Sequence, residues 1–175
     1  MEDMKGIALG IGIVFGLVLV MVFLERRLSK CDEHYDERQI LARGKGYKIS
    51  FLTVILLNIF YACFFYGLTK DIVSPQLVFM GIAFVGILVY SIYCIFKDAY
   101  VQVGQKIGRW VILLIFVIIA NVAAAFTGSE RGFNVDGFAT GSSINILIAI
   151  TFTIELIAVA IKFFIDKRGE AYEES

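Results

Sequence analysis

A single acidic residue inside a long apolar run has the clearest chemical potential in this sequence. Glu155 lies in the stretch 143–165, and an ionised carboxylate at mid-bilayer costs about 2.5–3.5 kcal/mol. The side chain must therefore be protonated, paired or in contact with water. At about 1.5 Å of rise per residue, Asn58 and Asn121 fall at nearly the same depth on two other helices. We predict that Glu155, Asn58 and Asn121 form an intramembrane polar cluster.

This cluster has two interpretations. In the first, a neutral Glu155 bonds the two amides and holds helices together, at roughly 0.6 kcal/mol per hydrogen bond. In the second, Glu155 exchanges a proton or cation at the midplane, and the protein is a small proton- or cation-coupled transporter. The first is favoured, because one acid without a membrane-embedded basic partner, a substrate groove or a broken helix is weak support for transport.

A metal site is the other chemistry to consider. Cys31 and His34 have a spacing that can contribute half of a zinc site, but structural zinc takes four ligands in paired spacings. The remaining cysteines, Cys63 and Cys94, lie in predicted membrane helices. We therefore expect a solvated polar turn around Cys31 and His34, with no metal and no other cofactor.

Catalytic signatures are absent from the sequence. It contains no Walker loop, dinucleotide fingerprint, Gly-x-Ser-x-Gly or His-Glu-x-x-His. We predict no catalytic residues and no enzyme activity. Nucleic-acid binding is not expected either, because membrane topology accounts for the basic residues.

The elements that position these residues are apolar helices. The chain has 175 residues, of which 59% are hydrophobic and 18% charged. A helix crosses the hydrocarbon core in about 20 residues, and helices leave no unpaired backbone edge in lipid. The sequence predicts one all-α, polytopic domain over residues 1–175. Its five transmembrane helices are expected at 6–24, 49–68, 76–96, 110–127 and 143–165, with Ser74 capping the third and Ser142 or Ser143 the fifth.

Basic residues indicate the orientation. Seven of the sixteen Lys and Arg lie in the charged loop 25–48. With five spans, thirteen of the sixteen fall on one side of the membrane and three on the other. Cytoplasmic loops collect Lys and Arg, so we predict that the N-terminus lies outside and the C-terminus in the cytoplasm.

The charged loop is also expected to contain a short amphipathic helix at 36–45, bent away from the second span at Gly44 and Gly46. Its cations can face lipid headgroups or a cytoplasmic partner; they are Arg38, Arg43, Lys45 and Lys48. In the first span, Ala8, Gly12 and Gly16 form a stripe of small residues. Such a stripe suits close helix packing, within the monomer or in a homo-oligomer.

The segment DERQILARGKGYKISF, residues 36–51, resembles the Asp-Glu-Arg-Gln signature that precedes a membrane span in small multi-pass membrane proteins of Gram-positive bacteria. Those proteins are mostly uncharacterised. The resemblance implies a bacterial plasma-membrane protein and implies no reaction. We therefore predict a membrane protein that acts as an accessory or regulatory component, through helix–helix or cytoplasmic-loop contacts with a membrane protein partner or a second copy.

Overall fold

A computed structural model describes residues 35–69, 72–103, 107–127, 134–135 and 138–173. The chain divides into two compact units, Met1–Glu37 and Arg38–Ser175. Nearly all of the described residues belong to the second unit. The predicted first span at 6–24 lies outside the described residues, together with Ala8, Gly12, Gly16, Cys31 and His34.

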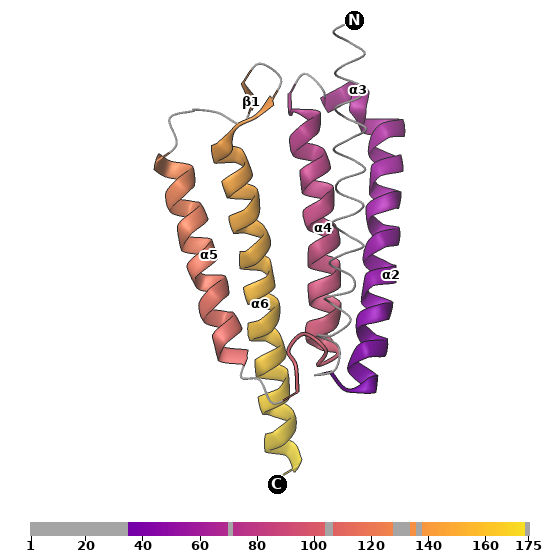
Figure 1. Ribbon diagram of the computed structural model, residues 1–175, viewed down its shortest axis with the longest axis vertical. Helices are drawn as coiled ribbons and strands as arrows, with labels where there is room; N and C mark the ends of the chain where they lie inside the picture. The colour runs from indigo at the N-terminus through magenta and orange to yellow at the C-terminus, as the bar shows by residue number, and fades with distance from the viewer. Residues whose placement is uncertain (1–34, 70–71, 104–106, 128–133, 136–137, 174–175) are drawn as a thin grey trace, which may run out of the picture. The chain divides into compact units, whose positions relative to one another are not determined.

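The described part of the chain is built from long helices (Figure 1). Four of them are long and apolar enough to cross a membrane, which confirms an all-α fold with four of the five predicted spans. The first predicted span, at 6–24, remains a prediction. In chain order the elements are α2 (Glu37–Phe60), the π-helical segment η2 (Tyr61–Phe65), α3 (Tyr66–Thr69), α4 (Pro75–Phe96), α5 (Ile107–Thr127), β1 (Asn134–Val135), β2 (Phe138–Ala139) and α6 (Gly141–Glu173).

The prediction of a separate amphipathic helix at 36–45 was wrong. Its residues form the first turns of α2, which continues through Gly44 and Gly46 without a break. Two glycines lower helix propensity but remove no backbone hydrogen bond. Gly46 serves close packing: a Cβ there would lie 3.2 Å from ring atoms of Tyr90 and Tyr93 on α4.

The second contact between α2 and α4 also depends on a glycine. A Cβ on Gly86 of α4 would overlap the Cγ2 methyl of Val54 on α2. One turn away, the Ser50 hydroxyl donates a hydrogen bond of 2.6 Å to the Gly86 carbonyl oxygen. Small residues let membrane helices approach closely enough for such contacts. Gly46 and Gly86 thus form a reciprocal pair, each accepting side chains from the other helix.

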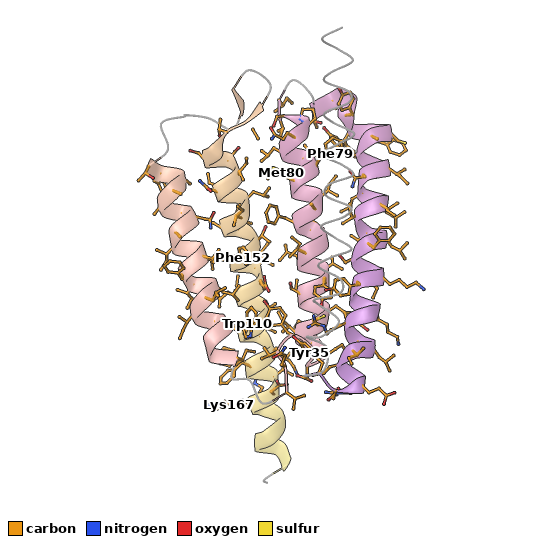
Figure 2. All side chains as sticks on the ribbon, in the orientation of Figure 1. Tyr35, Phe79, Met80, Trp110, Phe152 and Lys167 are labelled. Atoms are coloured by element: carbon orange, nitrogen blue, oxygen red, sulfur yellow. The ribbon has the colours of Figure 1, made fainter. Side chains whose placement is uncertain are left out.

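The π-helical segment η2 follows the C-terminal end of α2 directly, and its first residue, Tyr61, packs against α4. Tyr61 is buried, and its ring forms a T-shaped pair with that of Phe79, with centroids 5.6 Å apart; Phe79 is labelled in Figure 2. The wide turn is closed by the Tyr66 N–H, which donates to the Tyr61 carbonyl.

Helix α6 packs against both α4 and α5. Ile95 of α4 and Ala158 and Val159 of α6 form a buried apolar cluster, on which Val111 of α5 also packs. Large apolar side chains on other faces are exposed, for example Phe116 at 70%, which suits lipid as the surrounding solvent.

The helix starts follow local capping. Ser74 Oγ accepts a hydrogen bond from the Leu77 N–H, with Pro75 in the first turn, as predicted. The expectation that Ser142 or Ser143 caps α6 was wrong. Thr140 takes that place: its Oγ1 accepts from the Ser143 N–H at 3.2 Å, and the Ser143 hydroxyl donates to the Thr140 carbonyl at 2.8 Å.

Replacing Gly86 by Ala tests the close approach of α2 and α4. The new methyl group meets Val54, whose β-branched side chain has little rotamer freedom in a helix. We expect the free energy of unfolding in detergent to fall by about 1–3 kcal/mol. Gly81→Ala is the matched control, because a Cβ there meets nothing within 4 Å.

Adding Val54→Ala to Gly86→Ala should recover much of the loss, because it removes the overlapping methyl group. Equal stability of Gly86→Ala and Gly81→Ala would contradict the packing described here.

Candidate functional site

Polar side chains gather at one end of the second unit, which we call the charged end. Here α2 begins, residues 97–103 lead from α4 toward α5, and α6 carries its last turns (Figure 1). We call residues 97–103 the connecting loop. The three segments are far apart in the sequence but share hydrogen bonds and ion pairs.

The first residues of the connecting loop cap the C-terminal end of α4. Asp98 has a φ of 55°, and the Ala99 N–H donates to the Cys94 carbonyl at 2.8 Å while the Asp98 N–H donates to the Ile95 carbonyl at 3.2 Å. This is the Schellman arrangement, in which a left-handed residue closes a helix. Asp tolerates this conformation better than most non-glycine residues. The stop turns the chain at once toward α6.

Gln39 of α2 holds the loop from one side. Its Nε2 donates to the carbonyl oxygens of Asp98, at 2.6 Å, and Val101, at 3.2 Å. Gln39 is 6% exposed, so these bonds satisfy a buried amide group that would be costly to leave without a partner. Gln39 is the last residue of the Asp-Glu-Arg-Gln segment, so one residue of this segment anchors the connecting loop.

Lys162 of α6 holds the loop by charge. Its Nζ lies 3.0 Å from Asp98 Oδ1 and 2.6 Å from Asp166 Oδ1. The Lys162 side chain is 17% exposed, whereas Asp98 and Asp166 are 53% and 48% exposed. Exposed ion pairs contribute little to stability, so the main effect of this triad is to fix the position of three charges.

Glu155 is a deeply buried acid at this end of the chain. It exposes 2% of its surface, and its Oε1 accepts a hydrogen bond from the Tyr100 hydroxyl of the connecting loop. Tyr100 also packs edge-on against Trp110 of α5, with ring centroids 5.9 Å apart. Trp110, labelled in Figure 2, lies at the same end as the loop. The loop thus provides the donor that the buried acid requires.

The structure does not join Glu155 to the two asparagines through hydrogen bonds. Asn58 Nδ2 donates to the Val54 carbonyl, and Asn121 Nδ2 donates to the Val117 carbonyl, each at 2.8 Å and within its own helix. A bond to the carbonyl four residues earlier is available to short polar side chains in any helix. The sequence pattern identified the buried acid and missed its partner.

A groove opens beside this network, between α5 and α6. Its volume is about 540 Å³, and it is lined by apolar side chains of both helices and by residues of the connecting loop. Asp98, Lys162 and Asp166 also line it, whereas Glu155 is not among its described lining residues.

The basic residues predicted to meet headgroups or a partner lie on the first turns of α2. Arg38, Lys45 and Lys48 are exposed, and Arg43 is half-buried. Among the described residues no group of three metal-ligating side chains occurs; Cys31 and His34 are outside that part of the chain.

Sequence reasoning did not identify Tyr100, Asp98 or the anchoring role of Gln39. Tyr100 and Asp98 lie outside every apolar window, where a loop residue carries no periodic signal.

Comparison with protein-family models, with curated proteins and with solved structures finds no match, so the functional argument rests on this geometry.

Removing the Tyr100 hydroxyl tests the bond to the buried acid. Tyr100→Phe deprives Glu155 of its donor, and we expect the free energy of unfolding in detergent to fall by about 1–3 kcal/mol. Glu155→Gln should cost less, because its amide oxygen still accepts from Tyr100. Tyr66→Phe, at an exposed ring, is the control; a loss at Tyr100 no larger than at Tyr66 would argue against the bond.

Proposed function

We propose that this protein is a non-enzymatic integral membrane protein that acts as an accessory or regulatory component, binding a partner through its charged end. The observation that carries the proposal is the hydrogen bond between buried Glu155 and Tyr100 of the connecting loop. The buried acid Glu155 holds the connecting loop in place by accepting a hydrogen bond from Tyr100. An acid used in this way is a structural group, and the loop that it holds is a preorganised surface.

Preorganisation matters because ordering a loop on binding reduces affinity. The connecting loop contacts three helices: Gln39 of α2, Trp110 of α5, and Lys162 and Glu155 of α6. The exposed cations Arg38, Lys45 and Lys48 lie on the α2 turns at the same end. A fixed loop beside these cations suits a partner with acidic groups.

The proposal includes five spans, with the N-terminus outside and the C-terminus in the cytoplasm of a bacterial cell. Support comes from the distribution of charge: thirteen of the sixteen Lys and Arg fall on one side in that arrangement. The basic residues of α2 and of the last turns of α6 occur at the same end of the described helices. The charged end would then face the cytoplasm.

A transporter is the competing function. Proton or cation transport needs an acid that water or the ion can reach, and Glu155 exposes 2% of its surface. The nearby groove is lined by Tyr100 but not, among its described residues, by Glu155. These observations favour the accessory role.

Site-specific photocrosslinking in the native membrane tests the partner. A photoreactive residue at Lys45 should give an adduct of discrete mass, whereas one at Phe126, which is 87% exposed at the other end of α5, should not. Gln39→Ala should lower the Lys45 yield several-fold, since it frees the loop. Gln76→Ala, at the opposite end, is the control. Absence of an adduct at Lys45, or equal adducts at both ends, would contradict the proposal.

Proteoliposomes loaded with a pH-sensitive dye test the competing function. With a proton gradient imposed, we expect the internal pH to change no faster than in protein-free vesicles, and Glu155→Gln to leave the rate unaltered. A flux that requires the protein and disappears in Glu155→Gln would establish transport instead.

A further inference from the structure

We propose that the groove between α5 and α6 binds an amphiphile whose head is a cationic nitrogen and whose body is an alkyl chain. This inference does not depend on the accessory function. It rests on the groove, on the charges at its mouth and on its place along two membrane-spanning helices.

The body of the groove is apolar. Ile95 of α4, Val111 of α5 and Leu156, Val159 and Phe163 of α6 line it. Its volume of about 540 Å³ falls within the usual range of small-molecule sites, which are mostly apolar with a few placed polar groups. An alkyl chain is the ligand part that such walls favour.

The charged residues at the mouth of the groove determine which headgroup of the ligand binds there. Lys162 is largely enclosed and already lies between Asp98 and Asp166, while both carboxylates remain about half exposed. The triad carries one excess negative charge. A cationic nitrogen beside the two carboxylates completes an alternating arrangement of charge, whereas an anionic head would meet the same carboxylates as a repulsion. Tyr100, which also lines the groove, can contribute its ring to a cation.

The position of the groove indicates how the ligand arrives. Its α5 and α6 walls belong to segments long and apolar enough to cross a membrane, so a chain can enter from lipid while the head stays near the charged end. Two sources share this chemistry: an ethanolamine phospholipid of the bilayer, and a free lipophilic amine. A water-soluble anion fits neither the walls nor the mouth.

Binding is measured on the full chain in a non-ionic maltoside. Native mass spectrometry counts adducts with phosphatidylethanolamine or phosphatidylglycerol, and titration of the melting temperature compares dodecylammonium with dodecanol. We expect saturable binding of phosphatidylethanolamine, dodecylammonium or both, and weaker binding of the two controls. Phosphatidylethanolamine alone would identify a lipid as the occupant, and dodecylammonium alone a free amine; either supports the site.

Two variants test the place of binding. Asp166→Asn removes a mouth carboxylate without touching the connecting loop, and should weaken binding about tenfold or more. Ala160→Phe places a ring where Ala160 lines the groove and should abolish binding. Ile161→Phe, at an exposed neighbour outside the groove lining, is the matched control.

Equal binding of phosphatidylglycerol or dodecanol would overturn the proposal. So would the absence of binding by both cationic ligands, or unchanged affinity in Asp166→Asn and Ala160→Phe.

Discussion

A carboxyl group buried among apolar helices must have a hydrogen-bond partner, and this requirement organises the charged end of the protein. Burial of an unpaired polar group costs roughly 2–7 kcal/mol. For Glu155 the donor is the Tyr100 hydroxyl, which comes from the loop that leads from α4 toward α5. The loop must therefore lie against α6, and the early stop of α4 at Asp98 turns the chain in that direction. Gln39 and Lys162 then hold the same loop from α2 and from α6.

Close helix packing complements this polar network. Gly46 and Gly86 bring α2 against α4, so that the start of α2 can place Gln39 on the loop. Lipid offers no hydrophobic force between helices, and their association depends on contacts between small residues and on hydrogen bonds. The same helices leave a groove between α5 and α6 whose mouth shares Asp98 and Lys162 with the loop. The charged end is thus both fixed in geometry and open to a ligand.

Length and hydropathy were sufficient to predict the four described spans, because lipid permits few alternatives to a helix of about 20 apolar residues. They also singled out Glu155. They could not supply its partner, since Tyr100 lies in a short polar loop with no periodic pattern. The side-chain amides of Asn58 and Asn121 donate to backbone carbonyls of their own helices. The depth of a residue along a span does not show whether its side chain bonds its own helix or a neighbouring one. The bend expected at Gly44 and Gly46 failed because Gly46 meets two tyrosine rings of α4, a contact that only the packed structure provides.

A double-mutant cycle between Tyr100 and Glu155 tests the central claim most directly. The free energies of unfolding of Tyr100→Phe, Glu155→Leu and the double variant would be measured in one detergent. If the loop hydroxyl is the partner of the buried acid, the two changes remove the same interaction, and their effects are non-additive by about 0.5–3 kcal/mol. The double variant should then lose less stability than the two single variants together. Strict additivity would contradict the account.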